Sequence, residues 1–399
     1  MPQMRLTILF NRFGPYHLVR LKAAGACCEL TAIEFSAVDN TYEWDKVPGA
    51  SGFTRVTLFT DSSVENKSTE EVRRTLWQAL SESNPDVIVI PGWGSTPALL
   101  ALQWSRISKV PAVLMSDSQE IDEPRVSWKE WVKAKVVKQF SAGLVGGGPH
   151  KKYLTKLGLP ERFVFSGYDV VDNEYFSESA NAARAAASWY RNELRLPENF
   201  FLKSCRFIEK KNLFGLLDAY AKYSKETGPD AWQLVIIGDG VLRPQLEEQI
   251  KYLGLDSLVH LPGFKQYDEL PVYYGLAGAY IQASTTEQWG LVVNEAMASG
   301  LPVLVSERCG CAQDLVQEGV NGFTFDPFDL KGLPCLMGKI SSDDEKLEAM
   351  GLASSKKIMN WSPEVFADNL LKAAGVARNR LLPKTSWVSS LILNGLIYR

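Results

Sequence analysis

Two glutamates in the second half of the chain, Glu287 and Glu295, are separated by seven residues and flank a turn at Gly290. A helix over 291–299 is predicted to begin at that turn. Backbone amides at a helix start are unpaired donors at the positive end of the helix dipole, so those of Gly290 and Leu291 are candidate diphosphate ligands. Carboxylates repel phosphate, so the two glutamates are better suited to accept hydrogen bonds from hydroxyl groups, one from a sugar and one from a ribose.

A basic pair, Arg206 and Lys211, follows the predicted strand at 200–205. A diphosphate leaving group requires positive charge, and an arginine can bind two phosphate oxygens while a lysine acts as a point charge. Ligands of parallel sheets bind outside the carboxyl ends of the strands, which is where this pair is expected. An isolated basic pair is more often solvated surface, and Lys210 fits that interpretation.

Short apolar, β-branched runs that alternate with helix-length segments predict the elements that position these residues. Such runs are typical of parallel strands covered by helices on both faces. The first half contains runs at 5–10, 29–35, 55–59, 86–90, 112–116, 143–147 and 162–167. The second half contains runs at 200–205, 232–238, 257–263, 279–284, 302–306 and 322–325.

Because the series of strands occurs twice, the predicted fold class is α/β with two Rossmann-like, doubly wound domains facing an interdomain cleft. An alanine-rich, helix-prone segment ends in a turn at Pro197, where the boundary between the domains is expected. The expected domains are 1–196 and 197–375. Residues 376–399 are expected to form a tail that crosses back to the first domain.

Composition excludes several classes of protein. The 399 residues carry a formal net charge of -3, which argues against a nucleic-acid partner. The six cysteines include no Cys-x-x-Cys spacing, so a structural zinc site is not expected. We expect the cysteines to be reduced thiols of a cytosolic protein. The apolar run Leu6–Phe10 is too short for a signal peptide, and no run of 18 apolar residues occurs. The expected location is the cytoplasm.

Two segments leave contact with a membrane surface open. A helix predicted over 125–140 combines Trp128 and Trp131 with several lysines, and the tail at 387–399 is also apolar. One interpretation is that both pack on the first domain. The other is that they rest peripherally on an anionic membrane, as helices of this composition do.

The order of these motifs resembles that of the family-4 retaining glycosyltransferases, which have the GT-B fold. The resemblance covers most of the second half of the chain. It implies that the domain at 197–375 binds the nucleotide-sugar and that the domain at 1–196 lies on the acceptor side. It implies that Glu287 approaches the transferred sugar and that Glu295 binds the ribose. It also implies that Arg206 and Lys211 take the place of a metal ion, so that no metal and no cofactor are expected.

Two further segments of the second domain are similar to family motifs. Gly238 and Gly240 match a strand-to-helix turn of the family, although a turn of this kind requires no ligand. The segment HLPGF resembles a loop whose backbone receives the nucleotide base. The resemblance implies that Gly263, Phe264 and Lys265 border the donor.

In the first domain the resemblance is less complete. Gly14 and His17 lie at the turn after the first strand, where the family has a glycine-containing loop near the donor phosphates and the acceptor. Many relatives have a histidine after the fifth strand, and this chain has Asp117 and Ser118 there instead. We therefore expect His17 and Asp117 on the acceptor or sugar side, with different contacts to the donor sugar.

The predicted function is retaining transfer of a sugar from a nucleoside-diphosphate-sugar to an unidentified hydroxyl acceptor, without metal. One alternative is an epimerase or phosphorylase of the GT-B type, which product analysis distinguishes because transfer requires an acceptor and releases a nucleoside diphosphate. An alternative of another class is a non-catalytic, two-domain sugar-binding protein. Such a protein would bind the nucleotide-sugar without turnover.

Overall fold

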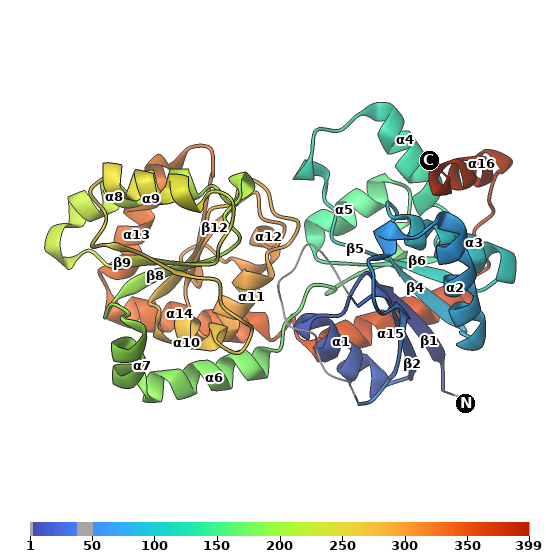
Figure 1. The fold of residues 1–399 in the computed structure, drawn as a ribbon, viewed down its shortest axis with the longest axis horizontal. Helices are drawn as coiled ribbons and strands as arrows, with labels where there is room; N and C mark the ends of the chain where they lie inside the picture. The colour runs from blue at the N-terminus through green and yellow to red at the C-terminus, as the bar shows by residue number, and fades with distance from the viewer. Residues whose placement is uncertain (1–2, 38–50, 399) are drawn as a thin grey trace. The chain divides into compact units, whose positions relative to one another are not determined.

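The computed structural model describes residues 3–37 and 51–398. The chain divides into two compact units (Figure 1). Unit 1 comprises Met1–Val171 together with Trp361–Arg399, and unit 2 comprises Asp172–Asn360. Among the described residues, no helix is long and apolar enough to cross a membrane.

Unit 1 is built on a parallel sheet of seven strands in the order β3-β2-β1-β4-β5-β6-β7. The order reverses direction at β1 and β4, as in doubly wound folds, and ligands of such folds bind near that point. The strands are β1 (Arg5–Phe10), β2 (Glu29–Ser36), β3 (Thr54–Phe59), β4 (Val87–Pro91), β5 (Ala112–Ser116), β6 (Ala142–Val145) and β7 (Val164–Ser166).

Helices cover both faces of this sheet because successive strand residues point to opposite faces. On β1, Ile8 packs into one apolar cluster with α1 and α15, and Leu9 packs into another with α2, α3, α5 and α16. The helices of unit 1 are α1 (Pro15–Gly25), α2 (Thr69–Glu82), α3 (Thr96–Ser108), α4 (Ser127–Val137), α5 (Gly148–Lys156), α15 (Pro363–Asn379) and α16 (Trp387–Ile397).

Unit 2 repeats the plan with six parallel strands in the order β10-β9-β8-β11-β12-β13. The strands are β8 (Phe200–Ser204), β9 (Gln233–Ile237), β10 (Val259–Gly263), β11 (Ala279–Gln282), β12 (Val303–Ser306) and β13 (Gly322–Phe325). The helices are α6 (Asn173–Ala185), α7 (Ala187–Leu194), α8 (Leu213–Thr227), α9 (Arg243–Tyr252), α10 (Leu270–Leu276), α11 (Leu291–Ala298), α12 (Ala312–Leu315), α13 (Leu333–Ser341) and α14 (Asp344–Ile358).

Each of the thirteen apolar runs forms a strand, and the predicted α/β class with two Rossmann-like domains is confirmed. The bounds of the units differ from the expected ones. Residues 173–194, expected in the first domain, form α6 and α7 of unit 2, and α6 packs against α10 with Ala180 close to the backbone of Gly275. Residues 363–375, expected in the second domain, belong to α15, which packs against α1 in unit 1.

Candidate functional site

The carboxyl ends of β8 and β11 bring two of the predicted catalytic residues, Lys211 and Glu287, together. These two strands pair in parallel, so the segments that follow them leave the sheet at the same edge. A single 3₁₀ turn, Glu209–Lys211, follows β8, and the loop with Glu287 follows β11. The two segments are joined directly, because the Thr285 amide donates to the Lys210 carbonyl at 2.9 Å.

Glu287 lies among lysines from the turn after β8. Lys211 Nζ donates to Glu287 Oε2, and Lys210 Nζ lies 3.9 Å from Glu287 Oε1. Burial acts to raise the pKa of the Glu287 carboxyl, but the charges of Lys211, Lys210 and Lys203 outweigh burial and hold that pKa below its usual value. The interpretation of Lys210 as plain solvated surface is therefore incomplete, since it contributes charge to this carboxylate.

The amides predicted to bind a diphosphate lie at the start of α11, and this role stays a prediction. Gly290 is the N-cap, with φ at +105°, which a residue with a Cβ rarely adopts. The Val293 amide donates to the Gly290 carbonyl at 2.8 Å. A glycine cap has no side chain that could accept from the earlier amides of the first turn, such as that of Leu291. Arg206, the other predicted phosphate ligand, follows β8 with an exposed side chain.

Glu295 is more buried than a residue predicted to bind a ribose would be. Its side chain lies on α11 with no exposed surface, and Tyr274 Oη donates to Glu295 Oε2 at 2.7 Å. A ribose would reach this carboxylate only if neighbouring side chains moved. The assignment of Glu295 to a ribose stays a prediction.

The predicted base-binding segment, 260–264, lies at the end of β10. Gly263 adopts φ of +85° at the end of β10, and its carbonyl accepts from the Gly238 amide at 2.9 Å. Phe264 is 37% exposed, so its ring is accessible for stacking. Lys265 is engaged by Glu269 at 3.6 Å. Gly238 itself is required by packing, since a Cβ there would lie 1.8 Å from the Cys205 carbonyl oxygen.

In unit 1, Gly14 and His17 form the cap of α1. The Gly14 amide donates to His17 Nδ1 at 3.1 Å, and the imidazole contacts the ring of Phe10 edge-on at 4.6 Å. Burial, helped by the charge of Arg20, lowers the pKa of His17 to about 3. His17 is therefore a neutral imidazole with its proton on Nε2, and it can offer a ligand a hydrogen bond but no charge.

Asp117, after β5, is accompanied by a carboxyl group that the sequence analysis did not single out. Asp169 follows β7 and is 5% exposed, with Arg20 Nη2 3.9 Å from its Oδ1. Burial and the charge of Asp117 raise the pKa of Asp169 to about 7, against the opposing charge of Arg20. The missed signal was its place directly after the strand run at 162–167, the same kind of place that Asp117 occupies.

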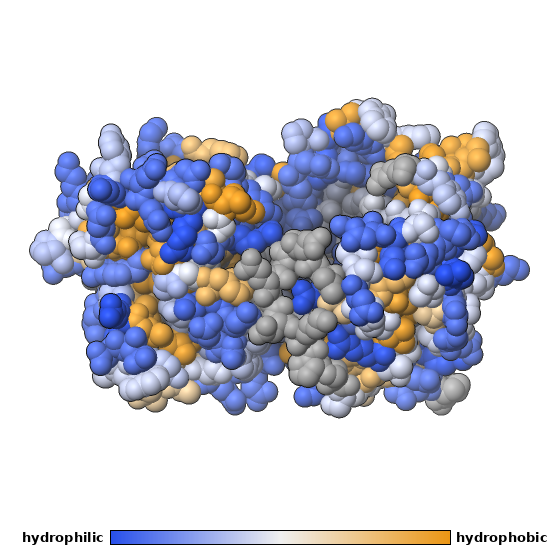
Figure 2. All heavy atoms as spheres, in the orientation of Figure 1, coloured by the Kyte–Doolittle hydropathy of each residue, from blue (hydrophilic) through white to orange (hydrophobic). Residues whose placement is uncertain are grey.

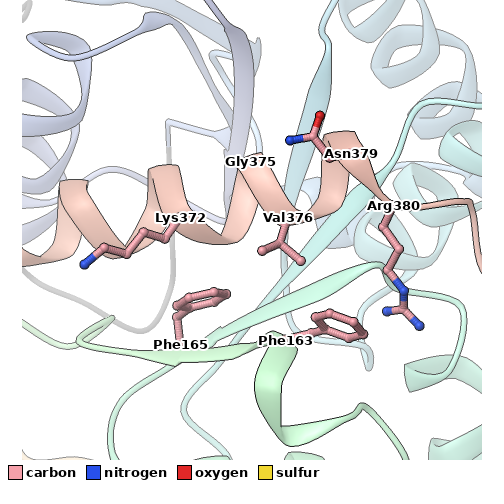
Figure 3. A pocket seen from close by; sticks show the side chains of 7 residues that line it. All are labelled: Phe163, Phe165, Lys372, Gly375, Val376, Asn379 and Arg380. Atoms are coloured by element: carbon pink, nitrogen blue, oxygen red, sulfur yellow. The ribbon is translucent and has the colours of Figure 1, made fainter.

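A separate pocket of about 560 Å³ lies in unit 1 beside β7 and α15 (Figure 3). The Arg380 guanidinium lies 4.1 Å from the ring centre of Phe163 at its edge. None of the residues predicted for the site lines this pocket. Its lining residues are Phe163, Phe165, Lys372, Gly375, Val376, Asn379 and Arg380.

Among the residues that the structure describes, no group of three or more His, Cys, Asp or Glu side chains is arranged to hold a metal ion. Cys309 and Cys311 are buried free thiols near Glu287. Burial, with the nearby charge of Glu287, raises the pKa of Cys309 to about 12, so this thiol is protonated at neutral pH.

Comparison with known proteins places these features in a family context. Residues 190–357 match the family described as glycosyl transferases group 1. The sulfoquinovosyl transferase SQD2 of Arabidopsis thaliana is 35% identical over 132 residues, which are 32% of this chain and 25% of that protein. The alpha-D-kanosaminyltransferase of Streptomyces kanamyceticus is 28% identical over 281 residues, 70% of this chain and 68% of that protein.

The first curated relatives are thus matched over less than half of their own length, from 25% to 44%. Among solved structures, Anabaena Alr3699/HepE in complex with UDP has a TM-score of 0.71 with 18% identity, covering 93% of this chain and all of that one. At this identity the likeness shows a shared fold.

Proposed function

We propose that this chain, whose residues 190–357 match the family described as glycosyl transferases group 1, is a retaining glycosyltransferase that needs no metal ion. Its donor is a nucleoside-diphosphate-sugar and its acceptor carries a hydroxyl group. The proposal rests on one observation above all. Two lysines surround the Glu287 carboxylate at the sheet edge where α11 also presents its N-terminal amides.

In this arrangement, different groups bind the diphosphate and the sugar. Lys211, Arg206 and the amides at Gly290 and Leu291 supply positive charge for the departing diphosphate. Glu287 accepts hydrogen bonds from the sugar hydroxyls. Stabilising the charge that develops on a leaving group is commonly the largest catalytic contribution, so a site of this kind favours departure of the diphosphate.

In the proposed step, the bond between the sugar C1 and the diphosphate oxygen breaks and the electron pair leaves with the diphosphate. The acceptor oxygen bonds to C1 on the same face, and the acceptor proton passes to a diphosphate oxygen. The sugar passes through an oxocarbenium-like state. Positioning of the two reactants supplies much of the rate.

The nucleotide to test first is uridine diphosphate, because Anabaena Alr3699/HepE, similar in fold, was solved with UDP. We assign the acceptor side to unit 1, where His17 and the carboxyl groups of Asp117 and Asp169 can bond hydroxyl groups. The test is a panel of nucleotide-sugars incubated with a mixture of hydroxyl acceptors. We expect nucleoside diphosphate release that depends on the acceptor, and a product whose anomeric configuration by NMR matches the donor.

Two other outcomes would favour the alternatives. An epimerised or phosphorolysed sugar without dependence on an acceptor would support an enzyme of a different kind on the same fold. Tight binding of a nucleotide-sugar with no turnover under any acceptor would support a sugar-binding protein.

We also propose that unit 1 rests on an anionic membrane surface through α4. The apolar side predicted for this helix is divided, because Val136 and Phe140 are buried while Trp128 and Trp131 are 64% and 51% exposed. Lys129 and Lys135 lie beside these two indole rings.

Exposed tryptophan flanked by lysine suits the boundary between lipid headgroups and acyl chains. The neighbouring α16, which packs on α4, adds exposed Trp387 and Leu391. Figure 2 shows apolar residues at the surface over α16.

A further inference from the structure

Lys203 is a cation in the interior of unit 2 that the proposed chemistry does not use. It lies on β8, a central strand of the sheet, and has no exposed surface. Central strands of parallel sheets are normally apolar, and a buried charge costs several kcal/mol unless it is well bonded. A lysine at such a position therefore requires a hydrogen-bond partner for its ammonium group.

The partner is Gln282 on the neighbouring strand β11. Lys203 Nζ donates to Gln282 Oε1. Tyr280 Oη, which has one proton to donate, lies 3.1 Å from the same oxygen and 3.2 Å from the Ser204 carbonyl oxygen. Lys203 and Tyr280 therefore both contact the oxygen of the Gln282 amide. With its oxygen engaged in this way, the amide has only one orientation in which its NH₂ group is also used.

That orientation directs the Gln282 amide toward the predicted site. Gln282 Nε2 lies 3.4 Å from Glu287 Oε2 and 3.3 Å from Ser284 Oγ, and Ser284 Oγ also lies 3.4 Å from Glu287 Oε2. Replacement of Lys203 by an apolar residue would remove one of the two groups that hold the amide oxygen and leave Tyr280. The buried lysine thus helps to fix the orientation in which Gln282 offers Glu287 a donor.

Charge acts in the same direction. Burial lowers the pKa of Lys203 itself. In its charged form Lys203, like Lys211 and Lys210, favours the ionised form of Glu287. Among the described residues, the thiols of Cys309 and Cys311, from the loop after β12, and that of Cys205, after β8, also lie near this carboxylate. These thiols have raised pKa values and are neutral at pH 7.

The three lysines differ in what a ligand can do to them. Lys211 follows the end of β8, and in the proposed function it bonds the diphosphate, which weakens its bond to Glu287. Lys203 is sealed within the sheet, so no ligand competes for it. The hydrogen bonds that link Lys203 to Glu287 through Gln282 therefore persist when the donor is bound.

We propose that Lys203 is a positioning residue for Glu287, which acts through Gln282 and keeps the carboxylate ionised and oriented while Lys211 engages the diphosphate. The part of this inference that concerns the donor rests on the proposed function. The coupling of Lys203 to Glu287 exists in the free protein and can be measured without any turnover.

The first measurement is the pKa of Glu287 in the free protein, by carbon-13 NMR of glutamate-labelled samples, with Glu287→Gln to assign the signal. We expect Lys203→Met to raise this pKa. Lys251→Met, which removes an exposed lysine from α9, should leave it unchanged. The double variant Lys203→Met/Gln282→Met replaces the buried polar pair by apolar side chains, which sheet interiors tolerate.

The double variant keeps the test decisive if Lys203→Met alone does not fold, and we expect it to raise the same pKa. A Glu287 pKa that stays at its wild-type value in the folded Lys203→Met or double variant would overturn the inference.

The second measurement is kinetic and separates this inference from the proposed function. Lys203→Met should lower kcat about tenfold, leave the donor KM within about twofold, and cause no further loss when Glu287 is already Gln. A loss of the same size in both backgrounds would contradict action through Glu287. If the wild-type protein transferred no sugar, the proposed function would fail, and the NMR titration would still decide the coupling.

Discussion

Lys211 and Glu287, 76 positions apart in the chain, form a hydrogen-bonded ion pair in which the side chains are only 12% and 14% exposed. A pair so shielded from water depends on both members, because removal of one leaves an uncompensated charge. In the proposed reaction a diphosphate competes with Glu287 for the same ammonium group. Donor binding and the state of this carboxylate are therefore linked.

Replacement of Lys211 by alanine should weaken nucleoside-diphosphate binding about 10- to 100-fold, because a hydrogen bond to a charged group contributes about 1.5–3 kcal/mol. Isothermal titration calorimetry with UDP measures the effect. The matched control is Lys331→Ala, which removes a lysine that is 88% exposed. Affinity for UDP that equals that of the control would remove Lys211 from the diphosphate site.

Substitutions of the two glutamates should have different effects on binding and on turnover. Glu287→Gln should keep nucleoside-diphosphate affinity nearly intact and reduce turnover of the sugar conjugate, because this residue is assigned to the sugar. Glu295→Ala should weaken binding of the donor and of the free diphosphate together, by about 1.5–3 kcal/mol per lost bond. Tyr274→Phe removes the hydroxyl that now bonds Glu295 and controls for the loss of that contact. If Glu295→Ala bound the diphosphate as the wild type does, the ribose assignment would be wrong.

Activity should be unaffected by EDTA, since cationic side chains and helix amides are proposed to balance the leaving-group charge. Loss of one such stabilising group typically costs about 10²–10³ in rate, and we expect a loss of that order for Arg206→Ala. Rates with EDTA, with added magnesium and for the variant give the comparison. Activity that disappears in EDTA and returns with magnesium would contradict the proposal.

The raised pKa of Asp169 predicts a dependence of stability on pH in unit 1. The folded state retains the proton up to about pH 7, whereas an ordinary aspartate loses it near 3.8. Folding then binds a proton between these values, so the stabilising contribution is complete below 3.8 and is lost as the pH rises through 7. Asp169→Asn cannot release the proton. Its thermal midpoint relative to that of the wild type should therefore be higher at pH 8 than at pH 5.

Asp230→Asn, at an exposed position, is the control for this experiment. Parallel pH profiles for wild type and Asp169→Asn would show that Asp169 titrates as an ordinary aspartate.

Membrane contact through α4 predicts that the protein sediments with vesicles containing phosphatidylglycerol at low salt and is released at high salt. Trp128→Ala/Trp131→Ala should abolish sedimentation without loss of the fold, because both side chains are exposed. Trp189→Ala removes an indole that is 62% exposed in unit 2 and should sediment as the wild type does. Charge reversal is best placed at Lys129, since Lys133 is already paired with Glu130. A protein that stays in the supernatant at low salt would disprove the contact.

The sequence predicted every strand of both sheets because residues buried on both faces leave a continuous apolar run. The predicted boundary at Pro197 was based on a local turn signal. The unit to which a helix belongs depends instead on the surface against which it packs. The buried side of α6, with Phe176 and Ala180, has its complement on α10, and nothing local to the sequence states this.

For the candidate site, motif spacing placed Lys211 and Glu287 correctly at one sheet edge, since parallel strands end together. It did not reveal how closely they pair, nor that Glu295 lies in the interior. Lys203 was passed over because a lysine within an apolar run carries no periodic signal. Its role depends on Gln282, which is 79 positions away and becomes a neighbour only when the strands pair.

Unit 1 is completed by residues that the ribosome makes only after those of unit 2. Helix α15 covers one face of its sheet with Phe366, Leu370 and Ala373, yet it follows the whole of unit 2 in the order of synthesis. The second unit can therefore finish folding while the first still exposes an apolar sheet face to the cell. Nascent chains arrested after residue 360 should attract chaperones that bind apolar surface, and release of the full chain should end that attraction.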